Sequence, residues 1–151
     1  MKIKYFLMAI AMMLCTNIYA QKSMSSAQQN LRSSILSYLR SEGYQPSIDE
    51  DGDIKFKRQG DVYFVIVSNK DESPMYVALA KYFTYGEKFT KSKINLCAEE
   101  INKYKMIKLM PNESSFMLHA EMYLTSASAF TNVFTKMMEV MEDAEEELTD
   151  M

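Results

Sequence analysis

Apolar side chains recur at helical spacing in three stretches of the chain, and each stretch predicts an amphipathic helix. The first covers residues 25–42, and Gly43 follows it in the position where helices commonly end. The second covers residues 91–104, and the third runs from about Ser128 to the end of the chain. The three apolar stripes comprise Leu31, Ile35, Tyr38 and Leu39; then Ile94, Cys97, Ala98 and Ile101; then Phe130, Val133, Phe134, Met137, Met141, Ala144 and Leu148.

The stretches between these helices either alternate between apolar and polar residues or are continuously apolar, and they predict β-strands. Asp51-Gly52 and Gln59-Gly60 supply tight turns of the kind found in hairpins. The sequence therefore predicts a single α+β domain with an antiparallel β-sheet of about six strands and three helices, in the order α-β-β-β-β-α-β-β-α. The expected strands are Tyr44–Ile48, Ile54–Lys57, Val62–Val67, Met75–Ala80, Met106–Met110 and Ser115–Leu124.

Residues 1–20 have the layout of a secretory signal peptide. Lys2 and Lys4 precede an unbroken apolar run from Tyr5 to Cys15, and Ala20 places a small residue before a cleavage site. We therefore expect the protein to be periplasmic or secreted, with residues 21–151 as its single mature domain.

Two alternatives for this segment are a membrane anchor and a lipid attached to Cys15. A spanning helix needs about 20 apolar residues, and the run here is eleven residues long. Lipid attachment normally requires a small residue before the cysteine, and Leu14 is large. We expect no stable membrane span once the segment has been removed.

Charge and cysteine content narrow the function further. Cleavage would remove two of the 17 basic residues and no acid, so 15 bases would face 20 acids and the net charge would be −5. Seven of these acids lie in the last thirteen residues, and residues 21–138 have no basic patch, so nucleic acid is not an expected partner.

The acidic C-terminal end opposes the helix dipole, which predicts fraying from about Glu145 onward. Cys97 would be the one remaining cysteine, so no intrachain disulfide is expected.

The acidic turn between the first two strands resembles a calcium loop in composition only. A loop that began at Asp49 would need glycine at its sixth position and an acid at its twelfth. Those positions hold Ile54 and Gly60, so a hairpin turn is the better interpretation.

Other candidates for chemistry are single residues. Cys97 lies on the apolar stripe of its helix, where a free cysteine behaves as a small hydrophobic residue. His119 is the only histidine, whereas a zinc site needs three or four ligands. We therefore expect no catalytic residue, no cofactor and no metal ligand.

The first hairpin reads Ile48-Asp49-Glu50-Asp51-Gly52-Asp53-Ile54-Lys55-Phe56. With a leading helix, further antiparallel strands, a middle helix, a second hairpin and a long final helix, most of residues 26–148 resembles the YbjN-like family. That family shares its architecture with the type III secretion chaperones. The resemblance implies a twisted antiparallel sheet with helices packed against it, often in a dimer, and a role in protein binding or chaperone-like holding of a partner. It brings no catalytic residues.

The strands Val62–Val67 and Met75–Ala80 are apolar on both faces, whereas an antiparallel sheet with one solvated face alternates. On the first of them, one of two alternating sets of side chains must therefore lie away from the main core. A helix, a second copy of the chain or another protein of the cell envelope has to cover it. The residues that we assign to this candidate protein interface are Tyr63, Val65, Val67, Tyr76, His119 and Tyr123.

These features favour an exported, non-enzymatic module that binds proteins or acts like a chaperone, as a homodimer or with another envelope protein. The alternative is an enzyme with an unrecognised active site. An enzyme should show a deep pocket with converging polar groups and perturbed titrating residues.

Export with cleavage after Ala20 is testable directly. Mass spectrometry of the protein from the envelope fraction should find a chain that begins at Gln21. Retention of residues 1–20, or a lipid on Cys15, would contradict this prediction.

Overall fold

The computed structural model describes residues 23–71 and 73–150, and the predicted signal peptide lies outside these residues. The described part contains three helices and a six-stranded antiparallel sheet, which confirms the predicted α+β fold and its element order. The elements are α2 (Ser26–Ser41), β1 (Ser47–Ile48), β2 (Ile54–Arg58), β3 (Asp61–Val67), β4 (Met75–Thr84), α3 (Lys91–Ile101), β5 (Ile107–Pro111), β6 (Ser115–Leu124) and α4 (Ala127–Asp150).

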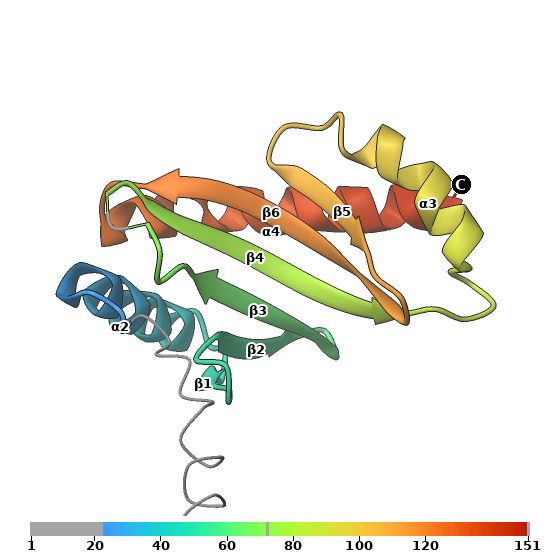
Figure 1. The fold of residues 1–151 in the computed structure, drawn as a ribbon. Coiled ribbons are helices and arrows are strands. Elements are labelled where there is room, and N and C mark those ends of the chain that lie inside the picture. The colour runs from blue at the N-terminus through green and yellow to red at the C-terminus, as the bar shows by residue number, and fades with distance from the viewer. Residues whose placement is uncertain (1–22, 72, 151) are drawn as a thin grey trace, which may run out of the picture.

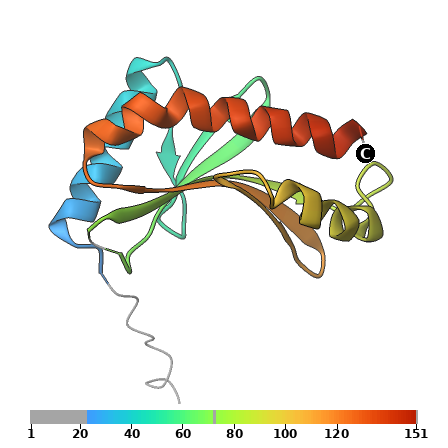
Figure 2. The same ribbon diagram turned by 90° about the horizontal axis from the view of Figure 1, so that it is seen from above.

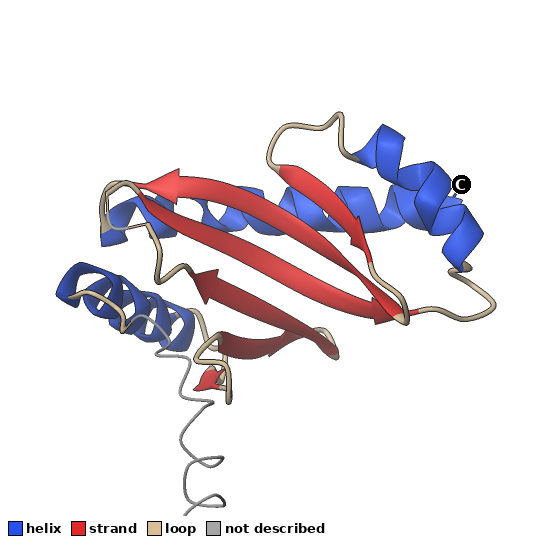
Figure 3. Cartoon of the chain, viewed as in Figure 1, coloured by secondary structure: helices blue, strands red, loops and turns tan. Residues whose placement is uncertain are grey.

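The strands are ordered β1-β2-β3-β4-β6-β5 across the sheet (Figure 1). The two longest strands, β4 and β6, are neighbours in the sheet (Figure 3) and pair along their whole length, from Met75 opposite Leu124 to Thr84 opposite Ser115. A two-residue turn at Gln59 and Gly60 joins β2 to β3, and both residues have positive φ. Since side chains of directly paired residues share a face, this register determines which side chains of the sheet lie together.

Helices α2 and α4 lie on one side of the sheet (Figure 2). Helix α4 contacts β5, β6 and the other two helices, while α3 packs against β5 and α4. The single core cluster between these helices and the sheet contains Ile35, Phe56, Leu79, Leu118 and Met137 among its fully buried members. Among the described helices, none is long and apolar enough to cross a membrane.

Helix α2 is held at both ends by local interactions. The Ser25 hydroxyl accepts a hydrogen bond from the Gln28 backbone N–H, and the Gln28 side chain accepts one from the Ser25 N–H, which forms a capping box. The buried Gln28 amide also donates to the Ser68 and Asp71 carbonyls, tying the helix to the loop after β3. Gly43, with φ of 87°, ends the helix as predicted.

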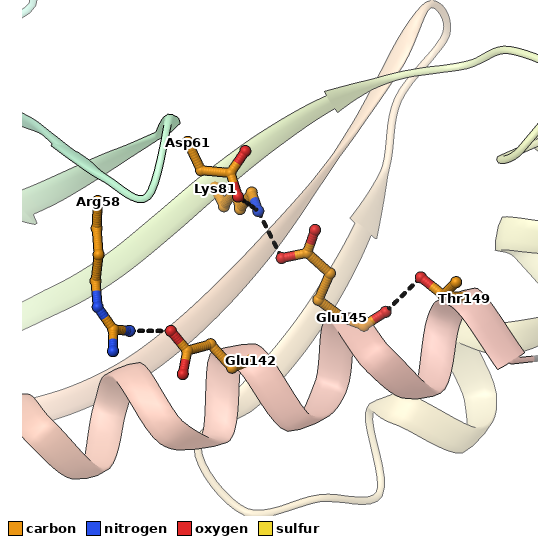
Figure 4. Close-up of polar contacts among 6 residues, drawn as sticks. All are labelled: Arg58, Asp61, Lys81, Glu142, Glu145 and Thr149. Atoms are coloured by element: carbon orange, nitrogen blue, oxygen red, sulfur yellow. Dashed lines mark hydrogen bonds and ion pairs between the residues drawn. The ribbon is translucent and has the colours of Figure 1, made fainter.

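The far end of α4 corrects the prediction that the helix frays from about Glu145. The helix continues to Asp150, and Leu148 in its last turns is completely buried. The Glu145 carboxylate lies 2.5 Å from the Lys81 ammonium group of β4 (Figure 4). Tertiary packing and this ion pair therefore offset the unfavourable charge at the helix terminus. The sequence alone does not show that Glu145 has a cationic partner.

Lys81 is the charged group that joins the sheet to α4. Its side chain is buried on the helix-covered face, where it also bonds Asp61 at 2.8 Å and lies over the rings of Tyr63 and Phe83. Burial opposes the charged form, but the hydrogen bonds to Asp61 and Glu145 outweigh it and raise the pKa of Lys81. The ammonium group is therefore charged inside the fold and needs its carboxylate partners.

Arg58 of β2 makes a second ion pair with α4. Its guanidinium group pairs with Glu142, one helical turn before Glu145 (Figure 4). The acidic residues of α4 that face the sheet are thus paired with bases from two different strands.

Shortening Leu148 should destabilise the fold if the last turns of α4 belong to the core. We expect Leu148→Ala to lower the free energy of unfolding by about 2–5 kcal/mol, because it leaves a cavity. Glu146→Ala, at an exposed position two residues away, should change it by no more than about 0.5 kcal/mol. Urea denaturation of both variants measures the difference, and equal small effects would show that the end of the helix is frayed after all.

Candidate binding surface

The sheet face opposite α2 and α4 is lined mainly by apolar and aromatic side chains. On β3 this open face carries Val62, Phe64 and Ile66, all partly exposed, and the strand contributes no charged side chain between them. On β4 it carries Ala78 and Ala80 in the middle, and neither is exposed at all. A solvated antiparallel sheet face normally presents polar residues, so this face has the composition of one that is covered. The remaining members are Lys55 and Lys57 of β2, Tyr76 and Tyr82 of β4, Met117, His119, Glu121 and Tyr123 of β6, and Lys108 and Met110 of β5.

Three of the predicted interface residues lie on the wrong face for that role. Tyr63, Val65 and Val67 are at most 6% exposed, and they belong to the core under the helices. The prediction that β3 is apolar on both faces is correct. However, the side chains on the open face are Val62, Phe64 and Ile66, and not Tyr63, Val65 and Val67. Tyr63 lies directly opposite Phe56 of β2, whose own neighbours Lys55 and Lys57 need solvent, and this pairing turns Tyr63 inward.

The other three predicted residues do lie on the open face, and they lie close together. The rings of Tyr76 and Tyr123 pack edge to face with centroids 5.5 Å apart, and Tyr123 is 61% exposed. His119 lies on β6 directly opposite Ala80. His119 is buried among its neighbours on this face, at 7% exposed.

A cluster of polar groups centred on Glu121 connects β4, β5 and β6. The carboxylate is 2.9 Å from the Lys108 ammonium group, accepts a hydrogen bond from the Tyr76 hydroxyl, and lies 3.4 Å from His119 Nδ1. Burial alone would raise the pKa of Glu121, but these three donors hold it below its usual value. Burial lowers the pKa of His119, which the bond to Glu121 only partly offsets, so the imidazole is neutral near pH 7.

A second pair of aromatic rings on the open face, from β3 and β4, also packs together. Phe64 and Tyr82 make an edge-to-face contact with centroids 5.1 Å apart, and Lys55 lies with its nitrogen 5.9 Å from the Phe64 ring centroid. Tyr82 is 49% exposed. A lysine at the rim and partly exposed rings in the middle are the arrangement typical of interface cores with a polar boundary.

The outer edge of the sheet beside this face is blocked. The Asn102 side chain donates to the Leu109 carbonyl and accepts from the Leu109 N–H, so both outward backbone groups at the middle of β5 are occupied. At the opposite edge, β1 has only two residues. A partner strand therefore cannot extend the sheet at the middle of β5, and the open face is the more accessible surface.

The acidic turn is a hairpin turn, as predicted from the sequence. The Asp49 carboxylate accepts hydrogen bonds from the backbone N–H groups of Asp51 and Asp53. The Arg32 guanidinium group donates to the Gly52 carbonyl, and both residues line a hollow of about 480 Å³. Burial, and then the negative charges of Asp49 and Asp51, raise the pKa of Asp53 from 3.8 to about 6.

Other candidates for chemistry remain isolated in the structure. Cys97 is buried on the inner face of α3, as its position on the apolar stripe predicted. Within residues 23–71 and 73–150, no three histidine, cysteine, aspartate or glutamate side chains converge as metal ligands. Sequence reasoning missed Lys81, although its parity with Val77 and Leu79 on β4 places it on the helix-covered face.

Comparisons with known proteins leave family and function open. No family model matches the chain, and no curated protein matches it. A crystal structure of an uncharacterised protein from Methanothermobacter thermautotrophicus is similar to 78% of this chain and 99% of its own, at 14% identity and a TM-score of 0.46.

The raised pKa of Asp53 predicts a pH-dependent effect on stability. The folded state binds a proton on Asp53 more tightly than the unfolded state, so stability should fall as the pH rises from about 4 to about 6. Asp53→Asn should therefore be more stable than the wild type at pH 7.5, and the gain should disappear near pH 4. Thermal melts across this range measure it. Asp51→Asn, at an exposed position, should give a smaller gain, and an equal effect of both variants would contradict the prediction.

Proposed function

We propose that the protein is an exported, non-enzymatic protein-binding module that uses the open sheet face to bind a second copy of itself. The observation that carries this proposal is the apolar strip formed by Val62, Phe64 and Ile66 beside the buried floor of Ala78 and Ala80. Such a strip, when it is contiguous and rimmed by polar residues, usually marks an interface.

A second copy fits this face for two reasons. The blocked middle of β5 disfavours addition of a partner strand at that edge, and this favours face-to-face docking. A two-fold axis near Ala78 and Ala80 would place the same apolar strip on both sides of the interface, with the lysines of β2 at its rim. Closed two-fold dimers are the commonest soluble oligomers, and they need one self-complementary patch.

The non-enzymatic part of the proposal is supported by the pairing of charged groups with one another within the described residues. Lys81 under α4 forms ion pairs with Asp61 and Glu145, and Glu121 on the open face forms an ion pair with Lys108. Both charged groups therefore have a structural role. The resemblance to the YbjN-like family also favours protein binding and dimer formation over catalysis.

Sedimentation velocity at micromolar concentration tests the proposal. The chain from Gln21 onward should sediment as a dimer, and Phe64→Asp should sediment as a monomer, because a charge in the centre of the interface would be desolvated without a partner. Leu96→Asp is the matched control, since Leu96 is a 77% exposed apolar residue on α3, away from the sheet face.

The melting temperature separates loss of assembly from loss of folding. Phe64→Asp should retain a cooperative melt because Phe64 lies outside the core cluster. A wild-type monomer, or a dimer that Leu96→Asp disrupts and Phe64→Asp does not, would overturn the proposed interface.

A further inference from the structure

The buried imidazole of His119 has a ring nitrogen that the open-face cluster does not use. Its side chain is 9% exposed, and its Nε2 atom is buried without a hydrogen-bond partner in the described part of the chain. Buried polar atoms are nearly always satisfied, so an exception calls for a group that could occupy the position.

Glu121 determines which nitrogen is left over. Its carboxylate oxygen lies 3.4 Å from Nδ1 and accepts a hydrogen bond from the Nδ1–H of the neutral ring, which leaves Nε2 with a lone pair. The two ring nitrogens flank Cε1 and point in diverging directions, so with Nδ1 at Glu121 the Nε2 lone pair is not directed at Glu121. On the other side of His119 from Glu121, the next residue of β6 on the open face is Met117.

Two methionines of the open face, Met117 and Met110, are neighbours of His119 in the sheet. Met117 is two residues from His119 on the same strand, so both side chains project from the same face about 7 Å apart along the strand. Met110 of β5 lies directly opposite Met117, where Cβ atoms are about 5 Å apart. The unbranched side chain of methionine has three rotatable bonds, so both sulfurs can reach toward the imidazole.

We propose that His119 Nε2 and the sulfurs of Met110 and Met117 form a binding site for a soft monovalent metal ion, Cu(I). Thioether and neutral imidazole ligands select Cu(I) over the hard ions that prefer oxygen. A histidine that binds metal through one nitrogen usually donates its other N–H to a carboxylate, and Glu121 is placed to accept it.

The site is exposed on its methionine side, since Met110 is 42% exposed. Nε2 is itself buried, so an ion that enters beside Met110 reaches it only when the neighbouring side chains move. Met106 is also exposed, at 37%, but it lies before β5 near Glu121, and its carbonyl accepts the Glu121 N–H. It therefore serves as a matched control methionine. The inference goes beyond the proposed dimer and does not rest on it.

The test is a competition titration of the chain from Gln21 onward with Cu(I) supplied as its bicinchoninate complex under ascorbate. This portion contains every residue of the core cluster, from Leu31 to Leu148, and so has the groups it needs to fold. We expect one Cu(I) per chain. Binding of Cu(I) should weaken at least about tenfold in each of the variants His119→Leu, Met110→Leu and Met117→Leu. Removing a residue that only hydrogen-bonds to a metal ligand already lowers metal affinity by about that factor.

Two controls keep the result specific. Met106→Leu and Cys97→Ala should bind Cu(I) like the wild type, which separates this site from the other methionine and from the buried thiol. Cu(I) should raise the melting temperature of the wild type but not of His119→Leu, while both have similar melts without metal. Absence of binding, equal binding by all variants, or dependence on Cys97 would each overturn the proposal.

Discussion

The packing of α4 along the sheet is the interaction on which the rest of the structure depends. The helix buries Phe130, Phe134, Met137, Met141 and Leu148 against the strands and α2. Phe134 packs against the rings of Tyr38, Tyr44 and Phe56, so one side chain joins α2, the loop after it and β2. Hydrophobic burial supplies the driving force, and the ion pairs of Lys81 and Arg58 determine how the helix lies across the strands.

Because the described helices gather on one side, the two faces of the sheet have different roles. The covered face contains a buried cation that is fully paired, whereas the open face contains a buried imidazole that is paired on one side only. Both polar groups lie among apolar neighbours. The fold alone accounts for the buried Lys81, because both of its partners belong to the described chain. The buried His119 needs a partner that binds to the open face.

The hydrophobic pattern was sufficient to predict the class and order of the elements, because each helix has a clear apolar stripe and the first two hairpins have glycine-containing turns at Gly52 and Gly60. The face of β3 was predicted wrongly since Val62–Val67 is apolar throughout. The signal was present one strand earlier: Lys55 and Lys57 must face solvent, and the two-residue turn at Gln59 and Gly60 sets them opposite Phe64 and Val62. The pairing of Lys81 with Glu145 could not be predicted, because it joins residues 64 apart in sequence.

The side-chain amide of Asn102 has a consequence for how copies of this chain can assemble. By occupying the outward backbone groups of Leu109, it removes the template on which an added strand would continue the sheet from one molecule into the next. Growth by strand addition has no natural end and leads to fibres, whereas a face that meets its own copy is used up after one encounter. A single amide thus biases the chain toward assemblies of finite size.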